Sequence, residues 1–370
     1  YIEACYPSSR SNKNSAMVFI ERGLSLLKND GFLGYIVPKS LAYSQKWASG
    51  RELILDKLGV ACDVSKAFKE VLLEQVIIVL SKRFSRQDHY EAIAWKGEEK
   101  TQSSIPKKIS VTTDSLLLGV TDEELAIFHK LSSSGLFMKD ISKTARGLSS
   151  QKYVTKGLQG KPVYRGDHIA RYTLHGTGES LPEEVLSGAK EKVAFLQQPK
   201  ILSQQIVAHV LYPVAHIILM STFDDKGILT LDTVQNTVLV NTKFHYGFIT
   251  ALLNSKLWSW YAYRFIFSRA IRTMHFDGYY LGKFPLPLIS FENPEGTKLH
   301  DELVALAEKM LKLNKRLALV RDTSSIEHTE ITSEIEHTNA EIDQKVYALY
   351  KLTEEERQII EASFGNNSVA

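Results

Sequence analysis

Two stretches of the sequence combine basic side chains with aromatic residues and glycines. Residues 145–172 hold six basic residues against one acid, Asp167, and residues 256–283 hold five against Asp277. A surface that grips a phosphate backbone requires such a composition, because cations neutralise the phosphates and glycines allow a close approach. The candidate nucleic-acid contacts in these stretches are Arg146, Lys152, Arg165, Arg171, Arg264, Arg269 and Arg272.

Other side chains near these stretches allow more than one interpretation. The aromatic residues between Trp258 and Phe265 recur at helical spacing, which favours burial in a core. Gln204 and Gln205, in the segment PKILSQQIVAH, could each read an adenine edge through two hydrogen bonds. They could equally be strand residues that face solvent.

Composition bounds the class of protein. A chain of 370 residues holds about two or three domains. Its net charge of +3 is too small to make the whole surface bind a polyanion, so any basic footprint is local. Cys5 and Cys62 have no metal-ligand spacing, and no apolar run approaches the roughly 20 residues that cross a bilayer. We expect a soluble, cytoplasmic protein with reduced thiols and no metal site.

Residues 14–83 supply the elements that must position this chemistry. A helix with an apolar stripe opens the stretch, and FLGYIVP follows as a strand that we expect to be buried on both faces. A second helix near 45–58, a strand near 60–64 and the apolar strand QVIIVL come next. This alternation is typical of a doubly wound (Rossmann-like) α/β sheet. Its chemistry would lie beyond the carboxyl ends of the strands, at residues 38–40 and in the loop 65–74.

Two segments here resemble a known family. NSAMVFIERGLSLLKNDGFLGYIVPKS and AFKEVLLEQVIIVL are similar to the second half of the catalytic domain of TaqI-like adenine-N6 DNA methyltransferases. The same pattern occurs in single-chain type IIG restriction–modification enzymes. Ala16 stands where the family has an aromatic residue, and Asn29-Asp30-Gly31 replaces Pro-Gly-Gly. Neither change removes a group that does chemistry.

This resemblance implies two aromatic site residues. Phe19, which lies off the apolar stripe of its helix, would lie against the adenine of the cofactor S-adenosylmethionine. Phe68 would stack on one face of the flipped target adenine, since base-modifying enzymes hold an extruded base between aromatic rings. The alternatives are that Phe19 packs on the sheet and that Phe68 covers the sheet edge.

A second resemblance covers residues 106–290, which are similar to the target-recognition domain of the same family. The matching segments, in chain order, are VYRGDHIARY, ALLNSKLWSWY and GKFPLPL. Met274 takes the place of the family residue that enters the space vacated by the flipped base, and an apolar, flexible side chain suits such a wedge. Arg269, Arg272 and His275 flank it and are candidates for phosphate or base-edge contacts.

The family also uses a Gly-rich cofactor loop and an Asn-Pro-Pro-Tyr catalytic loop, and neither motif occurs in this sequence. We therefore expect the C-terminal part of an S-adenosylmethionine-dependent adenine-N6 DNA methyltransferase of a type II (IIG-like) restriction–modification system. Its partners would be double-stranded DNA and the missing N-terminal catalytic half, and this chain alone would not methylate. The alternative is a stand-alone DNA-specificity subunit that works with a separate catalytic protein. Cleavage would lie outside this chain, because we find no Asp…(Glu/Asp)-x-Lys cluster on a predicted strand pair that could bind a metal.

The last stretch predicts long helices. Apolar residues step by three and four from Leu303 to Val320, and a second stripe runs from Ile331 to Leu349 after a polar turn. Three regions follow from the whole sequence. They are an incomplete methyltransferase sheet in 1–105, a mixed α+β target-recognition domain in 106–290 and a C-terminal helical hairpin with a short final helix in 291–370.

Overall fold

The chain folds into two compact units. The first comprises Tyr1–Phe128 and Tyr261–Arg272, and the second comprises His129–Trp260 and Thr273–Ala370. In this computed structural model the described residues are 5–10, 14–68, 70–96, 99–157, 159–271, 274–292, 294–320 and 322–365. These units have other limits than the expected regions 1–105 and 106–290. The first unit extends to Phe128, and it also includes segment 261–272, which lies more than a hundred residues further along the chain.

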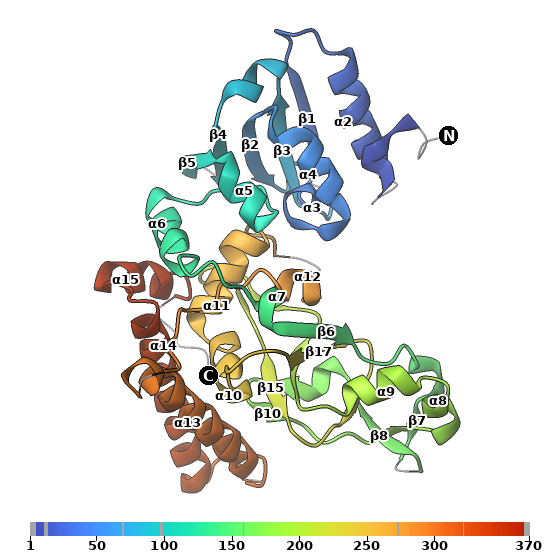
Figure 1. The fold of residues 1–370 in the computed structure, drawn as a ribbon, viewed down its shortest axis with the longest axis vertical. Coiled ribbons are helices and arrows are strands. Elements are labelled where there is room, and N and C mark those ends of the chain that lie inside the picture. Colours follow the sequence, from blue (N-terminus) through green and yellow to red (C-terminus); the bar gives the residue numbers. More distant parts are fainter. Residues whose placement is uncertain are drawn as a thin grey trace. The chain divides into compact units, whose positions relative to one another are not determined.

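The first unit is built around one sheet (Figure 1). Its elements are η1 (Pro7–Arg10), α2 (Ser15–Leu26), β1 (Leu33–Pro38), α3 (Ser40–Tyr43), η2 (Gln45–Trp47), α4 (Ala48–Leu55), β2 (Leu58–Ser65), β3 (Gln75–Leu80), η3 (Lys82–Arg86), β4 (His89–Lys96), β5 (Glu99–Pro106), α5 (Lys107–Thr113), most of α6 (Asp122–Leu131) and the π-helix η6 (Ala262–Ile266).

Strand order in this sheet is β1-β3-β2-β4-β5. Strand β3 lies between β1 and β2 and runs antiparallel to both, so those two strands run parallel to each other. Their last residues, Pro38 and Ser65, both pair with Gln75 at the start of β3. The two carboxyl ends and the loop that joins β2 to β3 therefore meet at one edge, as the sequence predicts. The predicted α/β fold class is confirmed.

Helix α2 has the predicted stripe. Met17, Ile20 and Leu24 are buried, whereas Phe19 is 65% exposed. The Asn14 side chain begins the helix by accepting a hydrogen bond from the Ala16 N–H at 2.9 Å.

One expectation for this unit is wrong. Strand β1 is not buried on both faces, because it lies at the sheet edge with Gly34 and Ile36 exposed. Residues 89–113, although rich in polar side chains, form the β4–β5 hairpin and α5 of this unit. Polar residues alternate there with buried ones such as Tyr90 and Ala92, because one face of the hairpin is open to solvent.

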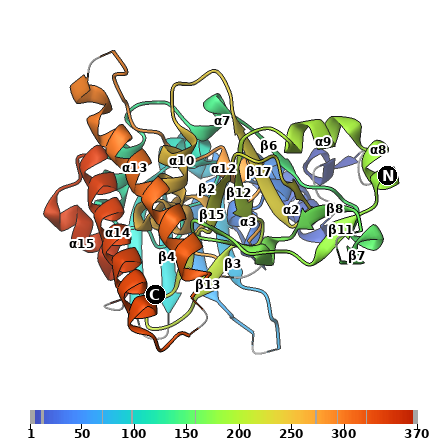
Figure 2. The ribbon, with the colours of Figure 1, turned by 90° about the horizontal axis from the view of Figure 1, so that it is seen from below.

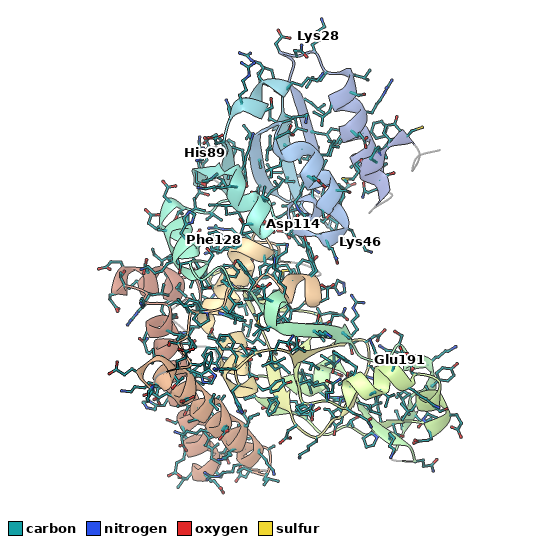
Figure 3. The ribbon with its side chains drawn as sticks, viewed as in Figure 1. Lys28, Lys46, His89, Asp114, Phe128 and Glu191 are labelled. Atoms are coloured by element: carbon teal, nitrogen blue, oxygen red, sulfur yellow. The ribbon has the colours of Figure 1, made fainter. Side chains whose placement is uncertain are left out.

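Segment 261–272 contributes to the core of the first unit. The rings of Tyr261 and Phe265 lie 6.2 and 5.0 Å from the ring of Phe128 in α6, which Figure 3 labels. Trp258, Trp260, Tyr261 and Phe265 are all at most 2% exposed, so the prediction that these aromatic residues are core is confirmed. Helix α6 begins with a capping box, in which the Thr121 hydroxyl and the Glu124 carboxylate each accept the other's backbone N–H.

The second unit contains smaller sheets. Its strands are β6 (Ser142–Arg146), β7 (Thr155–Lys156), β8 (Lys161–Tyr164), β9 (Ile169–Ala170), β10 (Thr173–Leu174), β11 (Glu179–Leu181), β12 (Lys200–Gln204), β13 (Ala208–Val210), β14 (His216–Ile218), β15 (Ser221–Asp224), β16 (Leu229–Thr230) and β17 (Val234–Leu239). A four-stranded antiparallel sheet has the order β15-β12-β17-β6, and a second sheet has the order β16-β8-β11-β7.

Helices complete the second unit. They are α7 (Met138–Ile141), η4 (Gln151–Tyr153), η5 (Gly166–His168), α8 (Glu183–Ser187), α9 (Lys190–Leu196), α10 (Tyr246–Leu253), α11 (Lys256–Tyr261), α12 (Gly278–Leu281), α13 (Pro294–Leu317), α14 (Ile326–Leu349) and α15 (Glu354–Ala362). Helices α13 and α14 pack side by side, which confirms the predicted hairpin (Figure 2). Within the described residues, no helix is both long and apolar enough to span a membrane.

Candidate nucleic-acid interface

Phe68 lies in the loop between β2 and β3, where its side chain is 52% exposed. One side chain at the start of β3 ties both arms of this loop. The Gln75 amide oxygen accepts a hydrogen bond from the Ala67 N–H at 2.9 Å, and its nitrogen donates to the Leu73 carbonyl at 2.7 Å. The Phe68 ring is therefore exposed on a loop with a fixed base.

A buried lysine lies beside this loop. The Lys39 ammonium, 3% exposed, donates to Asp63 at 2.7 Å, to Glu74 at 3.0 Å and to the Arg269 carbonyl at 3.1 Å. Its own backbone N–H donates to the Glu74 carbonyl at 2.8 Å. Burial alone would lower the pKa of Lys39, but the carboxylates of Asp63 and Glu74 outweigh burial and raise that pKa. The ammonium therefore stays charged.

The remaining carboxylate oxygens of this group bind backbone N–H groups. Asp63 accepts from the Ser65 N–H at 2.9 Å, and Glu74 accepts from the Ile271 N–H at 3.1 Å. We call Lys39, Asp63 and Glu74 the lysine hub. It joins the ends of β1 and β2, the Phe68 loop and segment 269–271 within the first unit.

Glu124 holds two of the predicted DNA contacts. The guanidinium of Arg264 lies 2.7 Å from this buried carboxylate, and that of Arg269 lies 3.1 Å from it. Arg264 is only 8% exposed, and this placement favours a structural role over a phosphate contact. Arg269 keeps a partly exposed side chain, with 23% of its surface open. Arg272 lies outside the described residues.

In the second unit, three segments converge on the turn Thr230–Thr233. Its backbone accepts N–H groups from Leu148 and Gln205. The approach is so close that a Cβ on Gly147 would lie 2.3 Å from the Leu231 oxygen, and one on Gly166 would lie 2.7 Å from the Thr233 oxygen. Glycine is required at both positions, because a larger residue would push the segments apart.

Side chains around this turn form what we call the polar cluster, namely Arg146, Gln151, Arg165, Gln205 and Asp232. In the amide orientation that satisfies both of its ends, Gln205 donates to the Asp232 carbonyl and accepts from Arg146, whose Nη2 is 2.6 Å away. Gln205 is 5% exposed, so it supports Arg146 and is not free to read an adenine edge. The Arg146 side chain is 49% exposed.

The polar cluster continues to the second predicted arginine. Gln151 donates to the Asp232 carboxylate at 2.7 Å and accepts a hydrogen bond from Arg165. The Nε of Arg165 lies 2.5 Å from Glu179. Arg146 and Arg165 are thus the two basic ends of one chain of hydrogen bonds, and both are partly open to solvent.

The other predicted contacts differ in accessibility. Lys152 is exposed, with its ammonium 4.7 Å from the centre of the Tyr153 ring. His275 is exposed next to Ile206, whereas Met274 is 1% exposed and would have to leave its packing to act as a wedge. Gln204 is half-buried and donates to the Ile169 carbonyl at 2.6 Å.

Arg171 has partners that link the sheet to helices of the second unit. It donates to the Asn254 carbonyl at 2.6 Å and to the Asn339 side chain at 3.2 Å. These contacts favour a structural role for Arg171 over the predicted DNA contact. Sequence reasoning missed Glu74, Gln151 and Asp232. Their partners lie far away in sequence, so no local pattern indicates them.

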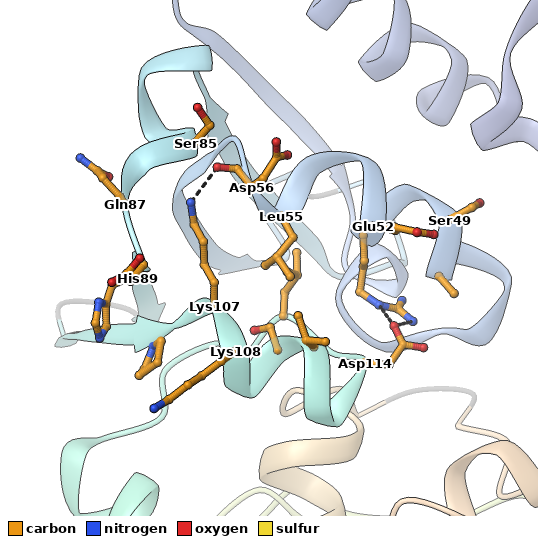
Figure 4. Close-up of a pocket in the computed structure, with 17 residues that line it drawn as sticks. Ser49, Glu52, Leu55, Asp56, Ser85, Gln87, His89, Lys107, Lys108 and Asp114 are labelled. Carbon is orange, nitrogen blue, oxygen red and sulfur yellow. Dashed lines mark hydrogen bonds and ion pairs between the residues drawn. The ribbon is translucent and has the colours of Figure 1, made fainter.

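A cavity of about 910 Å³ also lies in the first unit, between α4, α5 and the start of β4 (Figure 4). Lys107 in its wall donates to the Asp56 carbonyl at 2.8 Å, and Arg51 pairs with Asp114 at 2.9 Å. Burial lowers the pKa of Lys107. The cavity shares no residue with the Phe68 loop or the lysine hub, so it is not part of the interface described above.

Two family models match separate parts of the chain. Residues 161–286 match the family model of the TaqI-like C-terminal specificity domain, and residues 1–61 match that of the Eco57I restriction-modification methylase. No curated protein sequence matches the chain.

Among solved structures, the chain is similar to one of the type IIL restriction-modification enzyme MmeI in complex with DNA, with a TM-score of 0.51 and 11% identity. The match covers 98% of this chain and 51% of that one, so this chain spans about half the length of MmeI. The predicted resemblance is therefore confirmed: residues 161–286 are similar to TaqI-like specificity domains and residues 1–61 to Eco57I-type methylases. The likeness to MmeI concerns the fold.

Proposed function

We propose that this chain recognises a specific double-stranded DNA sequence as part of an S-adenosylmethionine-dependent adenine-N6 methyltransferase of a IIG-like restriction–modification system. The observation that carries the proposal is Phe68, a half-exposed aromatic ring on a loop tied at both arms by Gln75. A ring held in this way can stack on an extruded base at a lower entropic cost, because Gln75 already binds both arms of its loop.

The unpaired edge of β1 supports the proposal that a further segment, which carries the catalytic loop, completes the sheet. This strand is apolar, yet among the described residues it pairs only with β3. An apolar strand with an unpaired edge is a site for another strand. The sequence lacks an Asn-Pro-Pro-Tyr loop, so the group that binds the adenine amine would come from another segment or chain. We expect the assembled enzyme to act on DNA in the cytoplasm.

S-adenosylmethionine would supply the methyl group. Phe19 fits one wall of its site, because the ring is 65% exposed and lies opposite the buried stripe of α2. Its expected role is to pack against the adenine ring of the cofactor. The sequence contains no Gly-rich loop, so the rest of the cofactor site would also lie in another segment.

The proposal is tested by the base-holding role of Phe68. A target sequence is first selected with the chain from a random pool of duplexes. A duplex of that sequence with 2-aminopurine at the target position then reports base extrusion as an increase in fluorescence. We expect Phe68→Ala to weaken binding of an extruded base by roughly 1–3 kcal/mol, the usual worth of one aromatic stack. Leu72→Ala is the matched control, because Leu72 is 71% exposed on the same loop. Equal effects of both variants, or selection of no sequence from the pool, would refute the proposal.

A further inference from the structure

We propose that Lys39 is a positioning residue, which fixes the Phe68 loop and joins it to segment 269–271 so that they move as one body. The inference rests on the proposed function, in which Phe68 holds the target base. It assigns the task of aligning that base wall to the lysine hub, whose members do not touch the base.

The hydrogen bonds of the hub are complete. The three N–H groups of the Lys39 ammonium meet three acceptors, which are Asp63, Glu74 and the Arg269 carbonyl. Each carboxylate also accepts a backbone N–H with its second oxygen. A buried polar network in which every member is satisfied is rigid, because any displacement leaves a charged group without a partner.

The hub reaches both sides of the candidate site. Glu74 is the residue before Gln75, which ties the arms of the Phe68 loop. The second oxygen of Glu74 binds the Ile271 N–H, and Lys39 binds the Arg269 carbonyl. Arg269 has a φ of +57°, an uncommon conformation for a residue other than glycine. The hub and Glu124 together hold this segment in place.

Burying the Lys39 ammonium costs desolvation free energy that an apolar side chain of similar size would not. Replacing buried ion pairs by apolar side chains is often neutral or stabilising, so their presence is best explained where they specify one arrangement. Here the arrangement specified is the spacing between the base of the Phe68 loop and the Arg269 backbone. That spacing sets where an exposed aromatic ring lies relative to a partly exposed arginine.

Glu74→Ala is the informative variant, because Lys39 and Asp63 remain as a neutral pair and the chain can fold. We expect amide hydrogen exchange to accelerate about tenfold or more in the 370-residue chain at Ile271, whose N–H loses its acceptor, and at Ala67, whose acceptor Gln75 is the residue after Glu74. Gln75→Ala should accelerate exchange at Ala67 and leave Ile271 protected, since Gln75 binds only the loop. Unchanged exchange at both amides in Glu74→Ala would overturn the proposal.

A control separates positioning from general destabilisation. Lys39→Met and Lys200→Met each remove a fully buried lysine that pairs with an aspartate, but Lys200 lies in the second unit. Only Lys39→Met should accelerate exchange at Ala67 and Ile271 relative to global unfolding. Equal acceleration by the two variants would overturn the proposal.

A spectroscopic reporter links the hub to the base. The chain already holds four tryptophans, so the signal of Phe68→Trp is taken as the difference from the same chain with Phe68. Glu74→Ala should lower the steady-state anisotropy of this difference signal and reduce its quenching by a duplex with an unpaired target base. If Phe68→Trp shows no quenching in either background, the base-stacking function fails while the exchange data still decide the role of the hub. Normal anisotropy and quenching in Glu74→Ala would contradict the inference.

Discussion

The lysine hub and the polar cluster each hold groups of the candidate interface in place, but they do so with different kinds of contact. The hub holds the base of the Phe68 loop with an ammonium and two carboxylates that are all at least 90% buried. The polar cluster holds Arg146 through the Gln205 amide, and it holds Arg165 through the Gln151 amide beside the carboxylate of Glu179; both guanidinium groups stay partly exposed. Buried charges are confined to the geometry that satisfies them, whereas a partly exposed guanidinium can still bind a phosphate or carboxylate through two N–H groups.

This comparison predicts a larger stability loss at the hub. Lys39→Met leaves Asp63 and Glu74 buried beside each other without their cation, and we expect a loss of about 3–5 kcal/mol in the free energy of unfolding. Gln205→Leu removes a neutral support and should cost about 1–3 kcal/mol, the penalty for unsatisfied buried groups. Urea unfolding followed by circular dichroism measures both. A greater loss in Gln205→Leu would reverse the comparison.

The next largest effect concerns the backbone of the polar cluster. Gly147→Ala would place a methyl group 2.3 Å from the carbonyl oxygens of Thr230 and Leu231, so the turn must shift. We expect a cost of about 3 kcal/mol and weaker DNA binding, because Arg146 is the adjacent residue. Gly176→Ala in the same unit is the control, since its methyl group meets no atom within 4 Å. Equal melting temperatures for the two variants would show that the turn is not tightly held.

Much of this architecture could be predicted from local sequence. Asn14 and the stripe on α2, the capping box of Thr121 and Glu124 and the C-terminal hairpin all follow from short-range spacing. The hub could not be predicted, because the three acceptors of Lys39 lie 24, 35 and 230 residues away along the chain. The sequence indicated only that Lys39 follows a strand at the functional edge of the sheet.

Composition misled where polar residues play structural roles. The basic stretches contain Arg264 and Arg171, whose guanidinium groups bind Glu124, Asn254 and Asn339 inside their units. A count of charges cannot distinguish such a cation from one that faces a ligand, because the distinction depends on partners brought together by folding.

A buried carboxylate that forms no ion pair within the described residues sharpens the comparison with the hub. Asp343 of α14 is buried and accepts the Lys256 N–H at 2.9 Å. Burial raises its pKa to about 6, although that N–H and the charges of Arg171 and Lys256 favour the ionised form. The folded state thus retains a proton that the unfolded chain, with a carboxyl pKa near 3.8, has already lost. Stability should therefore fall as pH rises from about 4 to about 6, by about 2 kcal/mol.

Asp343→Asn keeps an oxygen that can accept the Lys256 N–H and removes the ionisation. We expect the variant to lose this pH dependence, so that its advantage over the parent chain is largest above pH 6. Urea midpoints measured from pH 4 to pH 8 test this. A parent curve that rises across that interval would contradict the sign.

The smallest effect we expect is on DNA binding at the exposed end of the polar cluster. Arg165→Ala removes one cation that is a candidate phosphate contact, so the slope of log affinity against log salt should flatten by about 0.9. Affinity should fall by about the same factor for all duplex sequences, because a phosphate contact carries no base information. Lys312→Ala, an exposed lysine on α13, controls for the loss of one charge. If the two variants give the same salt slope, Arg165 serves only to hold Gln151 and Glu179. Arg146 would then be the remaining candidate of the polar cluster for a phosphate contact.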